Sequence, residues 1–216
     1  MLWKVDSPSE ARSTKLIRRE LLNLPNALTI SRICLTPVFL VLLFEDDWYL
    51  RSMAVVVFAI ASLTDLYDGR LARTRNSVTE FGRFMDPLAD KILVTSALIA
   101  LVVGRIVHFW LVVPIIVRDL LITGMRLRGA YHGRQMETSR LAKWKTTVQL
   151  LAVFIILLLI GLQEIVQRFN WVVPLPIDGS WVPLLTNGLM AIVLFLTLLS
   201  GLHYFLRSRI SYKESQ

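Results

Sequence analysis

The chain has 216 residues, of which 55% are hydrophobic and 19% are charged. A soluble domain is about 45–50% apolar and about 25% charged, so this composition argues against a soluble domain, a disordered chain or a coiled coil. The formal net charge is +8, and because the cations lie between long apolar blocks, they indicate membrane orientation and affinity for anionic lipid or phosphate rather than for nucleic acid.

Residues 1–24 come before the first long apolar block. Apolar residues such as Leu16 and Leu21 lie among charged ones, which predicts an interfacial helix that leads to Pro25. A disordered tail is the alternative. The segment has neither the apolar core and cleavage site of a signal peptide nor a clear transit peptide, which favours a bacterial inner (cytoplasmic) membrane.

Six apolar stretches follow, each long enough to cross a bilayer as a helix. They cover residues 27–45, 49–67, 87–104, 107–125, 146–166 and 182–205. We therefore expect an all-α, polytopic integral membrane protein with six transmembrane helices in one domain, residues 25–210, and a C-terminal tail, residues 211–216.

The charges between the spans predict an orientation. All 24 Lys and Arg residues except Arg51, Arg105 and Arg168 fall on one side of the six-span arrangement. Because cytoplasmic loops carry an excess of Lys and Arg, both termini are expected in the cytoplasm.

Four carboxylates lie where the second and third spans reach the cytoplasmic side. Asp65 and Asp68 are spaced i, i+3, and Asp86 and Asp90 are spaced i, i+4, so each pair lies on one helical face. If the two helices are antiparallel neighbours, the four groups converge and repel one another unless cations lie between them. Such oxygen ligands suit two Mg²⁺ or Mn²⁺ ions, which in turn suit displacement at phosphorus. Alternatively, the aspartates pair at a solvated interface with nearby cations, namely Arg70, Arg73, Arg75, Arg83 and Lys91.

Small residues and a cation separate these carboxylates. Gly69 and Ala72 leave room for a bulky ligand beside Asp68, and Gly82 allows the facing helix or a nucleotide to approach closely. Arg73 supplies a planar cation that suits a phosphate.

The run DLYDGRLARTRNSVTEFGRFMDPLAD, residues 65–90, resembles the signature of the CDP-alcohol phosphatidyltransferase family, D-x2-D-G-x2-A-R-x8-G-x3-D-x3-D, at every fixed position. The resemblance implies that CDP-diacylglycerol is the donor, that the protein is a homodimer, and that the four aspartates hold two divalent cations. It implies that Asp90 is the general base. It also implies contacts to the CDP-diacylglycerol headgroup from Asp65, Gly69, Ala72 and Arg73.

Three polar residues at the start of the first span, Asn26, Thr29 and Arg32, share one helical face. Contact with the phosphates or ribose of CDP-diacylglycerol is one interpretation. The other is that Asn26 caps the helix and Thr29 bonds a backbone carbonyl. Thr79 similarly either contacts the nucleotide or caps the helix that follows it.

The acceptor alcohol is indicated by two further segments. Residues 23–37 and residues 139–149, SRLAKWKTTVQ, resemble the corresponding segments of the bacterial phosphatidylglycerophosphate synthases in this family. The acceptor that this resemblance implies is sn-glycerol 3-phosphate.

Four cations near the ends of the fourth and fifth spans fit a phosphorylated acceptor: Arg118, Arg140, Lys143 and Lys145. They could instead orient the protein and reach lipid headgroups. Arg118 lies deepest in its span, which favours a functional role. Lys143 and Lys145 are spaced i, i+2 and cannot face the same way, so one is expected to bind acceptor and the other to face lipid.

The sequence therefore predicts an enzyme that transfers the phosphatidyl group from CDP-diacylglycerol to sn-glycerol 3-phosphate by direct displacement, giving phosphatidylglycerophosphate and CMP. A cardiolipin synthase and a phosphatidylinositol-phosphate synthase are the alternatives within the family. A divalent-cation transporter is the alternative from another class, but the acids lie at one end of spans that are otherwise plainly apolar. Besides the substrates we expect membrane lipids as partners, and no nucleic acid.

Overall fold

The structure, a computed structural model, describes residues 24–75, 80–131, 140–169 and 181–213. It describes side chains over narrower ranges, namely residues 29–64, 88–89, 91–129, 142–169 and 181–204. The predicted N-terminal interfacial segment, residues 1–24, has only Leu24 in the described part.

Six helices make up the described ranges, apart from the short connections between them. They are α2 (Leu24–Phe44), α3 (Trp48–Arg75), α4 (Glu80–Val103), α5 (Phe109–Tyr131), α6 (Arg140–Phe169) and α7 (Val182–Lys213). Each predicted span lies inside one of these helices or extends past one of its ends by at most two residues. The prediction of an all-helical fold is thus confirmed.

Two of the helices contain segments long and apolar enough to cross a membrane, Ala142–Phe169 in α6 and Val182–Tyr204 in α7. The apolar parts of three other described helices are shorter, at Thr29–Phe44, Trp48–Thr64 and Lys91–Val103. This finding supports a membrane protein. The count of six spans and the cytoplasmic termini stay predictions.

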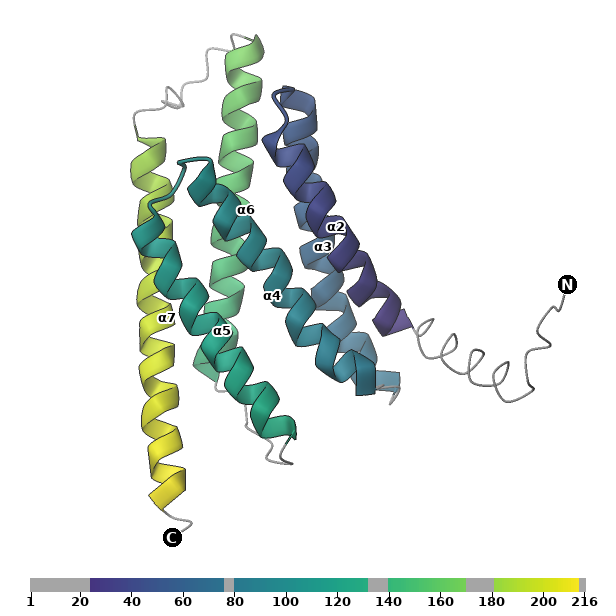
Figure 1. Cartoon of the computed structure of the whole chain (residues 1–216). Helices are drawn as coiled ribbons and strands as arrows, with labels where there is room; N and C mark the ends of the chain where they lie inside the picture. The colour runs from purple at the N-terminus through teal and green to yellow at the C-terminus, as the bar shows by residue number, and fades with distance from the viewer. Residues whose placement is uncertain (1–23, 76–79, 132–139, 170–180, 214–216) are drawn as a thin grey trace, which may run out of the picture.

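The helices run alternately up and down in an elongated bundle (Figure 1). α2 packs against both α3 and α4, α6 packs against α3 and α7, and α5 lies between α4 and α7. The α2–α3 and α4–α5 turns lie at one end. The last turns of α3, α5 and α7 and the first turns of α4 and α6 lie at the other end.

Apolar side chains fill the interior, and small residues bring the helices together. The rings of Phe39 and Phe58 are 5.4 Å apart between α2 and α3. Ala54 and Ala61 of α3 and Ala97 of α4 are fully buried, and their small size permits the close approach of neighbouring helices that is common in membrane bundles.

Large apolar side chains also cover much of the outside. Leu184 is 78% exposed, Trp110 is 74% exposed and Trp144 is 67% exposed. A soluble monomer rarely exposes so many large apolar side chains, whereas a lipid-facing surface requires them. The exterior therefore agrees with the apolar composition.

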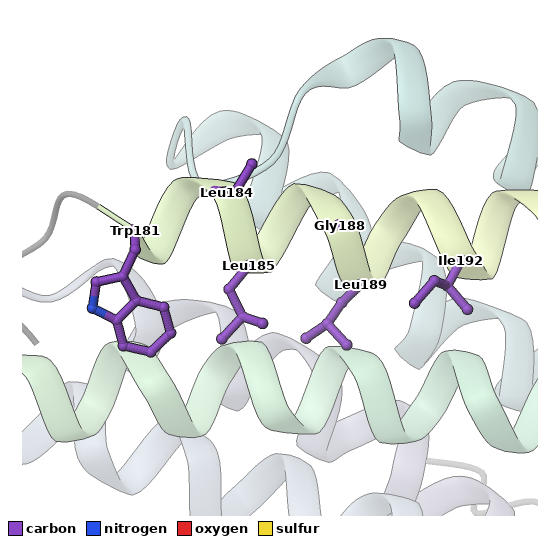
Figure 2. Close-up of a pocket in the computed structure, with 6 residues that line it drawn as sticks. All are labelled: Trp181, Leu184, Leu185, Gly188, Leu189 and Ile192. Atoms are coloured by element: carbon purple, nitrogen blue, oxygen red, sulfur yellow. The ribbon is translucent and has the colours of Figure 1, made fainter. Parts of the chain in front are cut away.

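An apolar groove of about 370 Å³ lies along the first turns of α7. In Figure 2 the side chains of Trp181, Leu185 and Leu189 point toward the neighbouring helix, and Leu184 points away from it. Gly188 lies between them and has open space around its backbone. The groove is at the far end of α7 from the signature and offers no charged group, so it does not suit a phosphorylated substrate.

Candidate active site

The family signature divides between two helices whose ends lie at the same end of the bundle (Figure 1). Asp65, Asp68, Gly69, Ala72 and Arg73 belong to the last turns of α3. The second half, Gly82, Asp86 and Asp90, belongs to the first turns of α4. Their side chains, and the whole of Thr79, lie outside the described part of the structure.

The helical backbone nevertheless constrains the acidic groups. Both halves of the signature are helical, so Asp65 lies one turn from Asp68 and Asp86 lies one turn from Asp90. The connection from Arg75 to Glu80 can span at most about 18 Å. Four carboxylates on adjoining helix ends form a donor set of the kind that hard divalent cations prefer, so these residues fit the metal ions that the signature implies.

The first span contributes buried polar groups at the same end. Thr29 is 4% exposed and Arg32 is 2% exposed, so both face the bundle interior. The hydroxyl of Thr36 donates to the carbonyl oxygen of Arg32 at 2.9 Å, just before Pro37 within α2. A buried arginine at the signature's end of the bundle suits an anionic ligand. The side chain of Asn26 lies outside the described ranges.

A cluster of four ionised side chains lies in the bundle interior, and we call it the Asp119 cluster: Lys91, Arg118, Asp119 and Lys145. Asp119 of α5 is 4% exposed, and its carboxylate accepts a hydrogen bond from the ammonium of Lys145 on α6. Nη1 of Arg118 donates to Asp119 Oδ1 at 3.1 Å. Nζ of Lys91 on α4 lies 3.7 Å from Asp119 Oδ2. Three cations around one carboxylate give the cluster a net positive charge.

The seventh helix completes this cluster. Nη2 of Arg118 donates to the hydroxyl of Ser200 at 2.7 Å, and that hydroxyl donates to the carbonyl oxygen of Thr197 at 3.1 Å. A Cβ atom at Gly201 would lie 3.7 Å from Nε of Arg118. Among the residues that the structure describes, this buried Nε has no hydrogen-bond partner. Arg118 therefore keeps a donor that a ligand could use.

The two lysines of the fifth span face opposite ways, as their spacing predicts. Lys145 is 1% exposed and belongs to the Asp119 cluster, whereas Lys143 is exposed. Gln149, one turn after Lys145, is 2% exposed, and its side-chain nitrogen has no partner within the described ranges. The inward face of α6 is thus polar near its start. The side chain of Arg140 lies outside the described residues.

Sequence reasoning missed two members of the Asp119 cluster as site residues. The sequence offers Lys91 only as a partner for the signature aspartates, but the structure pairs it with Asp119. Asp119, which directly follows Arg118, is not among the predicted site residues. An acid and a base side by side within an apolar stretch are a signal that could have indicated a buried ionic site. Ser200 gave no such signal, because serine beside glycine is common where membrane helices pack.

The fold and these residues together define a helical membrane protein with an acidic helix pair and a buried cationic cluster in the same half of the bundle. Residues 22–199 match the sequence profile of the family described as CDP-alcohol phosphatidyltransferase. The chain belongs to that family.

Curated relatives resemble the chain over most of its length. A CDP-diacylglycerol–glycerol-3-phosphate 3-phosphatidyltransferase of Bacillus subtilis is 41% identical over 148 residues, which cover 63% of this chain and 77% of the relative. A protein of the same name from Rickettsia typhi is 36% identical over 183 residues, covering 85% and 95%. A probable phosphatidylglycerophosphate synthase of Mycobacterium tuberculosis is 34% identical over 194 residues, covering 88% and 84%.

Proposed function

We propose that this protein transfers the phosphatidyl group from CDP-diacylglycerol to sn-glycerol 3-phosphate, giving phosphatidylglycerophosphate and CMP. The names of its relatives support the donor and the acceptor. The observation that carries the choice of a phosphorylated acceptor is the Asp119 cluster, because a buried site of net positive charge suits a phosphomonoester better than a neutral alcohol. Among phosphomonoesters, the names of the relatives favour glycerol 3-phosphate.

The donor is proposed to lie at the ends of α3 and α4. Asp65, Asp68, Asp86 and Asp90 would hold two divalent cations, Mg²⁺ or Mn²⁺, which when bound would offset charge on the diphosphate and on the CMP leaving group. Gly69 and Ala72 leave space for the cytidine diphosphate, and Arg73 offers it a planar donor, with Asp65 and Thr79 as further contacts. Asn26, Thr29 and Arg32, near the start of α2, are proposed as further contacts to the donor.

The chemical step is proposed to use Asp90 as the general base. Its carboxylate accepts the proton of the primary hydroxyl of glycerol 3-phosphate. The resulting oxygen attacks the phosphorus that bears diacylglycerol, the bond from this phosphorus to the CMP oxygen breaks, and CMP leaves. Direct displacement requires no covalent enzyme intermediate.

The acceptor phosphate is proposed to bind at the Asp119 cluster. Lys91 follows Asp90 directly on α4 and lies 3.7 Å from Asp119. One small acceptor could therefore present its hydroxyl to Asp90 and its phosphate to the cations of Arg118 and Lys145. Arg140, at the start of α6, is proposed to assist, whereas the exposed Lys143 is now assigned to the lipid-facing side.

The setting is proposed to be a bacterial inner membrane that six helices cross, with both termini and the active site on the cytoplasmic side and with two copies forming a homodimer. The distribution of cations supports this orientation. Arg51, Arg105 and Arg168 lie on the turns or helix ends opposite the signature.

Incubation of the purified protein with labelled CDP-diacylglycerol and one acceptor at a time tests the proposal. We expect CMP release and a phosphatidylglycerophosphate product with glycerol 3-phosphate, dependent on Mg²⁺ or Mn²⁺ and lost with a chelator. Phosphatidylglycerol and inositol phosphate serve as competing acceptors. Preferred turnover of either would reject the proposed acceptor while keeping the family chemistry.

A further inference from the structure

The carboxylate of Asp119 joins three helices through ionic contacts. Its partners are Lys91 on α4, Arg118 on α5 and Lys145 on α6. The carboxylate is 4% exposed, so water does little to screen these contacts. Asp119 does not belong to the acidic signature. It lies near the middle of α5, away from the helix ends that carry the signature.

The carboxylate of Asp119 offsets the repulsion among the three cations around it. Lys145 is 1% exposed, and Lys91 and Arg118 have side chains 21% and 16% exposed. Like charges confined in such an interior repel one another, and a buried ammonium is costly without a partner. Asp119 offsets one of the three charges and determines where each ammonium or guanidinium group lies.

Arg118 is held from two directions. Nη1 bonds Asp119 and Nη2 bonds Ser200, so the plane of the guanidinium is fixed between α5 and α7. The remaining edge carries Nε, which is buried against Gly201 of α7 and has no hydrogen-bond partner among the described residues. The Nε–H group is thus an oriented donor that these residues leave unsatisfied.

From this geometry we propose that Asp119 is a positioning residue for the acceptor. It holds Lys91, Arg118 and Lys145 in a preformed anion site, and it does not contact the phosphate itself, because two anions repel each other. The inference rests on the proposed function, since it assigns the cluster to the acceptor phosphate. The consequence is specific: loss of the Asp119 charge weakens the binding of the acceptor and leaves the binding of the donor unchanged.

The Asp119→Asn variant of the full-length protein tests this inference, because asparagine keeps the shape and removes the charge. We expect the KM for glycerol 3-phosphate to rise at least about tenfold, while the KM for CDP-diacylglycerol changes by less than about twofold. In the wild type, inorganic phosphate should inhibit competitively against the acceptor, and this inhibition should weaken in the variant. An unchanged acceptor KM, or equal rises for both substrates, overturns the inference.

Glu164→Gln is the matched control. It also converts a partly buried, ion-paired carboxylate into an amide, but at the opposite end of the bundle, where Glu164 pairs with Arg51. Both Michaelis constants should match those of the wild type. If this control raises the acceptor KM as much as Asp119→Asn does, the effect is a general loss of stability and the inference fails.

A second variant keeps the test decisive if Asp119→Asn does not accumulate. Asp119→Glu retains the charge but moves the carboxylate by one methylene, so we expect a rise of about threefold in the acceptor KM with an unchanged donor KM. No rise, or an equal rise for the donor, contradicts the positioning role.

Measurements on the wild type distinguish a failure of this inference from a failure of the proposed function. If the wild type prefers another acceptor, the proposed function fails. The same comparison of Asp119→Asn with wild type, made with that acceptor, then decides whether Asp119 positions the cations.

Discussion

Lys143 and Lys145 are two positions apart on α6, but their surroundings are entirely different. Lys145 is buried in the Asp119 cluster, and Lys143 is exposed beside Trp144, which is 67% exposed. A buried cation that contacts a carboxylate is fixed in place, whereas an exposed one reaches lipid headgroups or water and is not fixed. The pair therefore offers a comparison within a single helix turn.

Replacement of each lysine by methionine should separate their roles. Lys145→Met should raise the KM for glycerol 3-phosphate about tenfold or more, because it removes a fixed cation while Asp119 keeps Lys91 and Arg118 as partners. Lys143→Met should leave both Michaelis constants within about twofold. Steady-state kinetics with the acceptor varied at saturating donor measure this difference. Equal effects of the two replacements would remove Lys145 from the acceptor site.

Asp90 is the residue on which the proposed chemical step depends. Asp90→Asn should abolish CMP release while the protein still inserts and folds, because α4 continues through this position and the variant loses only the carboxylate proposed to accept the proton and to help hold the cations. CMP release and thermal unfolding of the purified variant provide the two readouts. Turnover near the wild-type rate would exclude Asp90 as the base.

At the scale of the helices, α3 and α6 are joined by an ion pair at the end opposite the signature. Arg51 of α3 contacts Glu164 of α6, and Nη2 of Arg51 also donates to the carbonyl oxygen of Glu45 at 2.8 Å. The side chains of Arg51 and Glu164 are 27% and 20% exposed, so the pair is partly shielded from solvent. Gly161, three residues before Glu164, lies against Val55 of α3 and lets the two helices approach closely.

Loss of this ion pair should destabilise the bundle without altering catalysis. Glu164→Gln should lower the free energy of unfolding by about 1–2 kcal/mol, between the values for exposed and fully buried pairs. Thermal unfolding in detergent measures the loss. A lowered kcat with unchanged stability would show that this end of the bundle communicates with the active site.

For the whole molecule, the alternation of the helices brings the end of α3 and the start of α4, which carry the signature, to the same end of the bundle as the start of α6, which carries Lys145 (Figure 1). That end also carries most of the cations between helices. The positive-inside rule therefore supports the proposed cytoplasmic location of the site, on the side where CMP and glycerol 3-phosphate are soluble.

Cysteine labelling tests this orientation. In a Cys34→Ser background, a membrane-impermeant maleimide should label His108→Cys, in the α4–α5 turn, from outside intact spheroplasts. It should label Gln216→Cys only in inverted vesicles. The backbone N–H of His108, rather than its ring, bonds Asn187, so the replacement preserves that contact. The proposed orientation puts these two sites on opposite sides of the membrane, so labelling of both from the same side would contradict it.

The sequence by itself determined the helices and the donor chemistry. The apolar stretches predict α-helices, because lipid cannot satisfy backbone hydrogen bonds, and each predicted stretch lies inside an observed helix or extends past its end by at most two residues. The spacing of Asp65, Asp68, Asp86 and Asp90 is local, so helical periodicity alone placed each pair on one face. The family signature is also local, and the family match confirms it.

Only the tertiary structure decided which cations belong together. Lys91, Arg118 and Lys145 come from three helices, and the periodicity of one helix says nothing about the face that another presents to it. The same spacing rule showed that Lys143 and Lys145 diverge but not which one points inward. That choice follows from packing, because the buried carboxylate of Asp119 is available only to a cation on the inner face of α6.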